Sequence, residues 1–262
     1  MCNSGRKIIN LLLICVFFFA GCRKENTNCW GGIVSHHDLA GKYIDGFFEE
    51  LSKTRDVETF VIICPSHFGL STKDWSVADY VWKLDNKKCV SSNKQKSETV
   101  RKNLGVEYDN QVFVIEHGAS TLMPYINKYF PKADAVVVAV QGEPPLVQPD
   151  AQKLYEAVMP LFADKKGKKN FLLISSDFAH HGNIEQTKEK DERSEQFFKN
   201  PVKENYFVLG CDNRPGMFVM SRFCNENTKV RILSHTNSYE ISGVDEDITS
   251  YFFVLMENTK KD

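Results

Sequence analysis

The chain has almost no excess charge of either sign. It carries 33 lysines and arginines against 34 aspartates and glutamates, a formal net charge of −1 over 262 residues. Its charged runs are mixed in sign, and no basic stripe alternates with aromatic residues, the arrangement expected of a nucleic-acid-binding surface. The sequence therefore predicts no nucleic-acid partner.

The sequence also lacks internal repeats and linkers rich in proline, glycine or serine. Its length suits one large α/β domain or two small ones. The apolar content of 42% and the charged content of 26% are close to the average for globular proteins. Since nothing divides the chain, we expect a single domain.

The longest apolar run, residues 8–20, is too short for a comfortable membrane span. It follows the positive pair Arg6 and Lys7 and ends at Gly21-Cys22. Small residues directly before a cysteine resemble the lipobox of bacterial lipoproteins, in which the chain is cleaved before a cysteine that carries lipid. An ordinary signal peptide or an uncleaved anchor is the alternative interpretation.

The lipobox pattern predicts three parts: residues 1–21 as a lipoprotein-type signal peptide, residues 22–30 as a tether, and residues 31–258 as the folded domain. Lipid on Cys22 would make the protein an exported, membrane-anchored lipoprotein of the bacterial cell envelope. Five cysteines would then remain, and an odd number leaves at least one outside an intramolecular disulfide. Cys211 is our candidate for that free thiol.

After residue 30, short apolar runs alternate with segments whose apolar residues have helical spacing. This alternation predicts an α/β fold, a single domain with a mostly parallel or mixed central sheet flanked by helices, with the last strand suited to a sheet edge. Residues 217–223 fit either a strand or a helix, and residues 73–94 are expected to hold a hairpin. The predicted strands are residues 31–35, 58–63, 112–115, 135–140, 171–175, 232–238 and 249–256, and the predicted helices are residues 39–53, 97–104, 120–129, 150–163 and a solvated 184–199.

Six of the seven histidines follow apolar runs that we interpret as buried strands: His36, His37, His67, His117, His180 and His181. Open α/β sheets place their ligand sites outside the carboxyl ends of strands. A single histidine at a strand end is more often a capping or solvated residue. Four strand ends that each deliver histidine indicate a metal or acid–base site assembled from distant parts of the sequence.

Three residues form a candidate ligand set: His36, His67 and Cys211. Neutral imidazole and thiolate are good ligands for iron, zinc, copper or cobalt, and three protein ligands leave open positions of the kind that catalytic metals need. The spacing between them is too long for a local metal motif. Cys211 has the alternative of an inert buried thiol.

Asp177 and His180 lie three residues apart after a predicted strand and can face one site across a turn. His180 could serve as a general acid or base. Asp177 could orient a ligand histidine or fix the tautomer of His180. The alternative is an aspartate N-cap with a surface histidine.

Glu116 and His117 follow the run 112–115, so His117 could bind substrate with Glu116 as its partner, although an N-cap region for the next helix is equally compatible. His37 and His181 are each the second of a pair and are secondary, because neighbouring residues at a strand end point to opposite sides. His235 lies inside a predicted strand as a core or ladder residue.

The ordered motifs resemble the Memo family, also called AmmeMemoRadiSam system protein B. They are Ile-Val-Ser-His36-His37, Pro-Ser-His67, Glu116-His117, Ser-Ser-Asp177-x-x-His180 and Gly-Cys211-x-x-x-Pro, with Ser250-Tyr251 similar to the closing strand of that family. The resemblance extends from about Gly31 to Met256. The sequence departs from the family at Ser35, where proline is usual, and at Asp212, where glycine is common.

The resemblance implies a fold similar to that of class III (LigB-type) extradiol dioxygenases, which hold nonhaem iron on two histidines and a carboxylate. In the Memo family two histidines and a cysteine take that place, which implies His36, His67 and Cys211 as metal ligands here. It also implies Asp177, His180 and His117 as further site residues. Iron or copper is the cofactor that the resemblance favours.

Three functions are therefore open. The first is a nonhaem-metal redox or dioxygenase-like enzyme anchored at the cell envelope, with His180 as the acid–base group, Asp177 as its orienting residue and His117 on the substrate side. The second is a non-catalytic binding or adaptor module that presents a peptide or small molecule. The third is a surface lipoprotein that captures metal. The substrate or partner is an unidentified small molecule or peptide.

Overall fold

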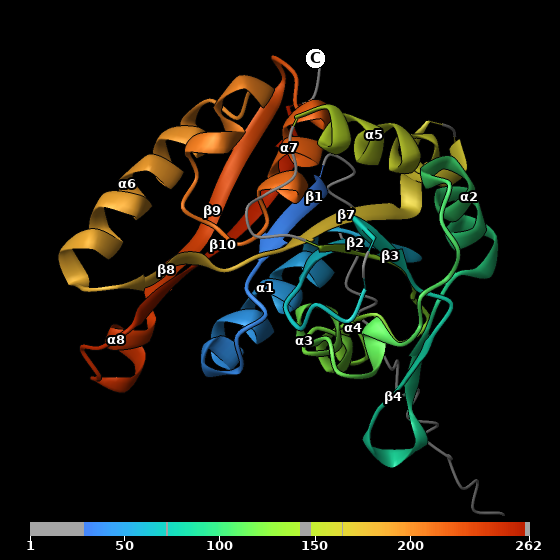
Figure 1. Ribbon diagram of the computed structural model, residues 1–262, viewed down its shortest axis with the longest axis horizontal. Coiled ribbons are helices and arrows are strands. Elements are labelled where there is room, and N and C mark those ends of the chain that lie inside the picture. Colours follow the sequence, from blue (N-terminus) through green and yellow to red (C-terminus); the bar gives the residue numbers. More distant parts are fainter. Residues whose placement is uncertain (1–28, 72, 142–147, 164, 260–262) are drawn as a thin grey trace, which may run out of the picture.

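The computed structural model describes residues 29–71, 73–141, 148–163 and 165–259 (Figure 1). These residues form one α/β domain with a mixed central sheet flanked by helices, which confirms the predicted fold class. The predicted signal peptide and Cys22 lie outside the described residues. Within those ranges, no helix combines the length and the apolar character needed to cross a membrane.

The central sheet has eight strands in the order β3-β6-β2-β7-β1-β10-β8, with β9 paired to β10. Strands β6, β2, β7 and β1 are parallel, whereas β3, β8, β9 and β10 join the sheet in antiparallel pairs. The strands are β1 Cys29–Val34, β2 Thr59–Ser66, β3 Trp75–Val77, β6 Asp134–Gln141, β7 Asn170–Ser175, β8 Phe178–Gly182, β9 Thr228–Asn237 and β10 Ile248–Asn258.

Helices cover both faces of the sheet (Figure 1). Alternate residues of β2 enter separate cores: Phe60 and Ile62 pack on the face of α1, α3 and α4, and Val61 and Ile63 on the face of α2, α5, α6 and α7. Burial on both faces explains why such strands read as continuous apolar runs. The helices are α1 Gly41–Thr54, α2 Lys94–Leu104, α3 His117–Ser120, α4 Met123–Tyr129, α5 Gln148–Val158, α6 Ile184–Lys199, α7 Arg214–Phe223 and α8 Ser238–Ser242.

Three neighbouring parallel strands determine where the site lies. Strands β2, β7 and β1 are adjacent and run in the same direction, so their carboxyl ends meet at one edge of the sheet. His67 is the first residue after β2, and His36 and Asp177 are the second residues after β1 and β7. The topology thus brings together residues that are far apart in the sequence, as the strand-end pattern predicts.

The predicted strand at residues 112–115 is wrong. Val112–Val114 form a 3-10 helix, in which Val112 and Phe113 are buried while Val114 and Ile115 are more than half exposed. A single turn can bury two adjacent apolar side chains without a strand. His117 therefore begins a short helix, with Glu116 as its N-cap, rather than ending a strand.

The predicted edge position of the last strand is also wrong. Strand β10 lies between β1 and β8 and additionally pairs with β9. Its residues from Ile248 to Met256 are all buried. Such an unbroken run is incompatible with an exposed edge, since an edge strand in water needs polar side chains on at least one side.

The structure also decides the predictions for residues 217–223, for the hairpin and for the start of the first strand. Residues 214–223 form a helix, α7, and the predicted hairpin is present as β4 (Val81–Lys83) and β5 (Cys89–Ser91), which projects from the body of the molecule (Figure 1). Strand β1 begins at Cys29, two residues before the predicted strand. In the described part of the chain the cysteines are free: Cys29, Cys64, Cys89, Cys211 and Cys224.

Candidate metal centre

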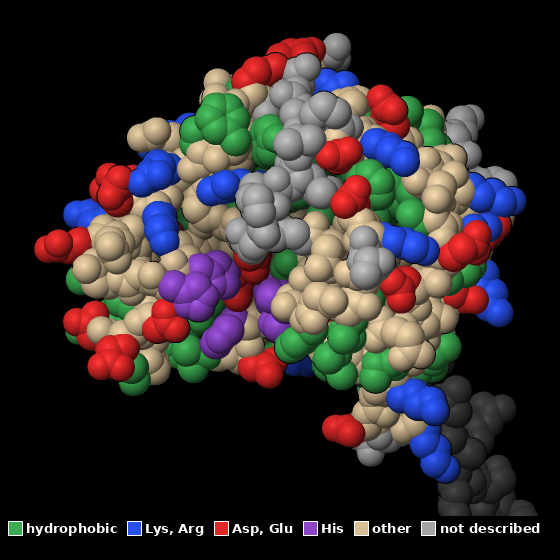
Figure 2. Space-filling model, viewed as in Figure 1, with side chains coloured by type: hydrophobic (Ala, Val, Ile, Leu, Met, Phe, Trp, Pro, Cys, Tyr) green, Lys and Arg blue, Asp and Glu red, His purple; other side chains and the backbone are tan. Residues whose placement is uncertain are grey.

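Histidine side chains gather at one place on the surface, beside acidic side chains (Figure 2). The ring centroids of His36 and His67 lie 4.9 Å apart, and those of His36 and His117 lie 5.3 Å apart. His67 and His117 stack at 4.0 Å. The strand ends and the N-terminus of α3 thus bring three predicted site histidines into direct contact.

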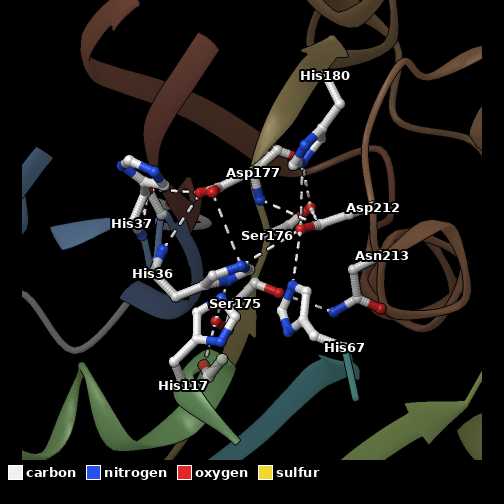
Figure 3. A network of polar contacts seen from close by, with 12 residues as sticks. His36, His37, His67, His117, Ser175, Ser176, Asp177, His180, Asp212 and Asn213 are labelled. Atoms are coloured by element: carbon white, nitrogen blue, oxygen red, sulfur yellow. Dashed lines mark hydrogen bonds and ion pairs between the residues drawn. The ribbon is translucent and has the colours of Figure 1, made fainter. Parts of the chain in front are cut away.

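Carboxylates complete what we call the histidine–carboxylate cluster: His36, His67, His117, His180, Asp177 and Asp212 (Figure 3). Two groups of three residues have ligand atoms that all lie within 4.8 Å of one another. One group is His36, His67 and His117, and the other is His36, Asp177 and Asp212. His36 belongs to both groups and is almost fully buried.

Asp212 occupies the middle of the cluster. Its Oδ2 lies 3.3 Å from Nε2 of His36, 3.4 Å from Nε2 of His180 and 3.7 Å from Nε2 of His67. Burial raises the pKa of Asp212, but the three surrounding imidazoles lower it more, so it is held well below its usual range. Neither Asp212 Oδ2 nor His180 Nε2 has a hydrogen-bond partner, although both atoms are buried.

The Nδ1 atom of His36 forms a hydrogen bond with a serine hydroxyl. Ser175 Oγ donates to the carbonyl oxygen of Gly118 and lies 2.9 Å from His36 Nδ1. Because the hydroxyl proton is used by that carbonyl, Ser175 accepts from His36 Nδ1–H. In the neutral ring, Nε2 is then unprotonated and faces Asp212. Burial lowers the pKa of His36, but the charges of Asp177 and Asp212 outweigh it and raise it.

His67 is oriented in the same sense by Glu116. The carboxylate accepts from His67 Nδ1 at 2.6 Å, from the His67 backbone N–H at 2.8 Å and from the Gly118 backbone N–H at 2.8 Å. Burial lowers the pKa of His67, but the neighbouring carboxylates of Asp212 and Glu116 raise it to about 9. A carboxylate on one nitrogen and an open face at the other is the usual arrangement around a metal-binding histidine.

Asp177 contacts the first strand end rather than His180. Its Oδ1 accepts from the hydroxyl of Ser35 and from the backbone N–H of His36, and its Oδ2 lies 3.7 Å from His36 Nε2. Of the two roles open to it in the sequence, this geometry matches the orientation of a ligand histidine. Ser35 supplies one of these contacts.

His180 enters the cluster from β8, a strand that the sequence did not reveal. It is flanked by Ala179 and His181, which have positive φ angles of 30° and 54°. Such angles cost about 1–3 kcal/mol per non-glycine residue and concentrate at functional sites. They turn His180 toward Asp212, while its carbonyl oxygen accepts from Lys190 Nζ at 2.7 Å. Burial lowers the pKa of His180, but Asp212 raises it.

His117 lies at the outer side of the cluster, with 41% of its side chain exposed. Its pKa is lowered by burial and by the neighbouring rings of His67 and His36. Phe68 packs edge-on against it at 5.6 Å. This exposed position suits the substrate-side role predicted for His117.

Cys211 belongs to neither group of potential ligands within the described residues. Its backbone forms an antiparallel bridge with Phe178, and its side chain packs against the apolar core on the face of α2, α5, α6 and α7. Burial raises the pKa of its thiol to about 12. The structure therefore brings together five of the six predicted site residues, and the carboxylate beside Cys211 faces the site instead.

Three histidines lie outside the cluster. His37 contacts Tyr251, and His181 is mostly exposed and pairs with Asp247 at 2.7 Å. His235 lies opposite Phe252 in the sheet ladder and contacts Asp191 at 2.9 Å. The secondary place that the sequence gave to His37 and His181 matches these positions.

Asp212 was missed as a functional residue because the sequence shows it only as a departure from the usual glycine. Its place is set by Asn213, whose Nδ2 donates to the carbonyl oxygens of Ile63 and Ser175 at 2.9 Å each. Asn213 also caps α7 by accepting from Gly216 N–H at 3.0 Å. The only signal in the sequence is a carboxylate in the turn that starts at Cys211.

The chain is similar to known proteins of one family. A family model described as Memo-like protein matches residues 23–254. A MEMO1 family protein of Sulfurisphaera tokodaii is 23% identical over 205 residues, which cover 75% of this chain and 71% of the relative. A MEMO1 family protein of Pyrobaculum arsenaticum is 22% identical over 243 residues, which cover 88% of this chain and 85% of the relative.

Proposed function

The chain belongs to the Memo-like protein family, and on that premise we propose that it binds a redox-active metal ion in the histidine–carboxylate cluster. The observation that carries the proposal is the convergence of three imidazole Nε2 atoms within 3.7 Å of Asp212 Oδ2. Oδ2 has no hydrogen-bond partner despite its burial. A buried, unpartnered oxygen among imidazole nitrogens is what a cation would satisfy.

The hydrogen bonds at the Nδ1 atoms of His36 and His67 fit a metal site. Ser175 and Glu116 accept from the Nδ1 atoms of His36 and His67, so the Nε2 lone pairs of the neutral rings are directed into the cluster. A metal needs that unprotonated nitrogen. His36 and His67 would hold the ion together with a third group from the Cys211–Asp212 turn.

Iron or copper in this position would supply redox chemistry, and we propose a dioxygenase-like or other oxidoreductase reaction. His180 would move a proton at its Nε2, which faces Asp212. Asp177 would keep His36 in position through its contacts with the backbone and ring. His117, at the exposed side, would contact the substrate.

A non-catalytic binding module is the second candidate, and exposed apolar side chains favour it. Phe68 and Leu70 follow His67 and are each 49% exposed. Val114 and Ile115 precede Glu116 and are also exposed. A peptide or small molecule could bury these side chains. A binding module would keep its ligand affinity after His180→Ala, whereas an enzyme would lose turnover.

We further propose that the protein is exported and held at the membrane by lipid on Cys22. The apolar run 8–20 and the small residues before Cys22 support this location. An anchored site would face the metal supply outside the cytoplasm, and metal capture at the cell surface is the corresponding non-enzymatic role.

Metal titration tests the proposed function. The protein is treated with chelator, dialysed, and titrated calorimetrically with Fe(II) without oxygen and with Cu(I) in a second series. We expect one ion per chain, lost in His67→Ala and kept in His181→Asn. The control removes an exposed imidazole and tolerates its left-handed backbone, since asparagine adopts that conformation readily. Equal binding by His36→Ala, His67→Ala and the unmodified protein would refute the proposal.

A further inference from the structure

The Asp212 carboxylate is arranged as a ligand rather than as an ion-pair partner. Its Oδ2 lies 3.3 to 3.7 Å from three histidine nitrogens, distances that are long for hydrogen bonds. Two ligand atoms of one tetrahedral ion, each bonded at about 2.1 Å, lie about 3.4 Å apart. The separations therefore fit atoms that share a cation better than atoms bonded to one another.

The second oxygen of Asp212 fixes the direction of the first. Oδ1 accepts from the hydroxyl of Ser176 at 2.8 Å and from the backbone N–H of Asp177 at 3.0 Å. The carboxylate side chain is 90% buried, since its exposed fraction is 10%. Two donors on Oδ1 hold the plane of the carboxylate, so Oδ2 points into the cluster without freedom to turn away (Figure 3).

Cys211 is directed elsewhere by the backbone. It pairs with Phe178 in an antiparallel bridge, and the backbone N–H of Asp212 donates to the carbonyl oxygen of Asp177 at 3.1 Å. Asp212 faces the histidines, whereas the side chain of Cys211 packs against the apolar core.

We propose that Asp212, and not Cys211, is the third metal ligand, which gives this chain two histidines and one carboxylate. This inference rests on the proposed function, because it assumes that the cluster binds metal. A carboxylate is a hard ligand, whereas a thiolate favours Cu(I). Two histidines and a carboxylate with open positions form the ligand set of nonhaem Fe(II) enzymes, so the chain is suited to Fe(II) rather than Cu(I).

The test uses Co(II) as the probe, with calorimetry for affinity and absorption spectroscopy for ligand identity. A cysteine thiolate bound to Co(II) produces an intense near-ultraviolet charge-transfer band. We expect no such band in the unmodified protein or in Cys211→Ser, and equal Co(II) affinity in both within about twofold. Asp212→Asn, which keeps an oxygen for Ser176 and removes the charge, should weaken Co(II) binding by at least about tenfold.

The outcomes separate the two proposals. Asp212→Cys serves as a positive control, because a thiolate at that position should create the missing band. A band in the unmodified protein that disappears in Cys211→Ser, with unchanged affinity in Asp212→Asn, would overturn the assignment of Asp212 while leaving metal binding intact. No Co(II) binding by the folded unmodified protein would instead overturn the proposed function, and this inference with it. Circular dichroism confirms that each variant is folded.

Discussion

At the scale of single residues, Glu116 has two roles at once, as the N-cap of a helix and as the partner of a site histidine. It caps α3 through Gly118 N–H, and it fixes the ring and backbone of His67. Two oxygens serve three donors, so replacement by a residue with one oxygen leaves at least one donor without its partner. The site therefore depends on a residue that never touches the metal.

Glu116→Gln should lower the affinity for Fe(II) by about 10–100-fold, since partners of ligand histidines have effects of that size. Glutamine keeps the volume and one acceptor but loses the negative charge that holds His67 Nδ1–H. Anaerobic calorimetry measures the change. An affinity within twofold of the unmodified protein would show that Glu116 does not orient His67 for metal binding.

The positive φ of His181 gives a second prediction, which concerns stability. Glycine adopts a φ of 54° without strain, whereas a Cβ in this region costs about 1 kcal/mol. His181→Gly and His181→Ala lose the same exposed contact with Asp247. The free energy of unfolding of His181→Gly should therefore be about 1 kcal/mol higher than that of His181→Ala, which denaturant unfolding measures. A less stable glycine variant would contradict the backbone geometry around His180.

Residue identities were predictable where a residue follows a buried strand. His36, His67 and Asp177 follow β1, β2 and β7, and the carboxyl ends of neighbouring parallel strands must meet. Asp212 was not predictable in this way. Its direction depends on Asn213 and on the bridge between Cys211 and Phe178, which are tertiary contacts that one sequence does not display.

At the scale of elements, the turn before α7 joins two neighbouring strands to one helix. Asn213 donates to the carbonyl oxygens of Ile63 in β2 and of Ser175 at the end of β7, it caps α7, and it is almost fully buried. Gly216 has no room for a side chain, because a Cβ there would lie 2.8 Å from Ile174 Cγ2. The helix therefore begins against the sheet, at the position that sets Asp212.

Asn213→Ala should lower the free energy of unfolding by about 3 kcal/mol, because three buried hydrogen bonds lose their partner. It should also weaken metal binding, since the Asp212 turn loses its attachment. Urea denaturation measures the first effect and calorimetry the second. Asn205→Ala, a substitution in the 3-10 helix Lys203–Val208, is the control. A loss below 1 kcal/mol would contradict the structural role of Asn213.

The strands that are buried on both faces were predicted from continuous apolar runs. The secondary-structure predictions failed where a short segment does not have the sequence pattern of its element. The run 112–115 forms a 3-10 turn in which only two residues are buried. Strand β8 carries polar histidines and irregular φ angles, so it shows no period of two residues. Strand β10 was predicted at an edge of the sheet. Its unbroken apolar run favours a position inside the sheet, but the strands with which it pairs are not encoded in the local sequence.

At the scale of the whole molecule, the two ends of β1 separate the proposed anchor from the site. Residue 29 begins β1 and His36 follows its end, so the strand spans about 20 Å between them. The chain between Cys22 and the start of β1 reaches at most about 25 Å more. A lipid on Cys22 would hold the domain near the membrane by the edge opposite the histidine–carboxylate cluster.

Cys22→Ser should release the protein from the membrane fraction of a bacterial host, because serine cannot form the thioether to lipid. Fractionation of the cells followed by immunoblotting gives the result. Cys29→Ser is the control, since it alters the cysteine that begins β1, and it should remain in the membrane fraction. Equal membrane content in Cys22→Ser and the unmodified protein would contradict lipid anchoring.

The central claim is that distant strand ends form one metal site, and anomalous diffraction tests it most directly. Crystals of the protein loaded anaerobically with Fe(II) are measured on both sides of the iron absorption edge. We expect one anomalous peak bounded by His36 Nε2, His67 Nε2 and Asp212 Oδ2. An iron-loaded crystal with no peak at these three atoms, or with its peak elsewhere on the molecule, would contradict the account.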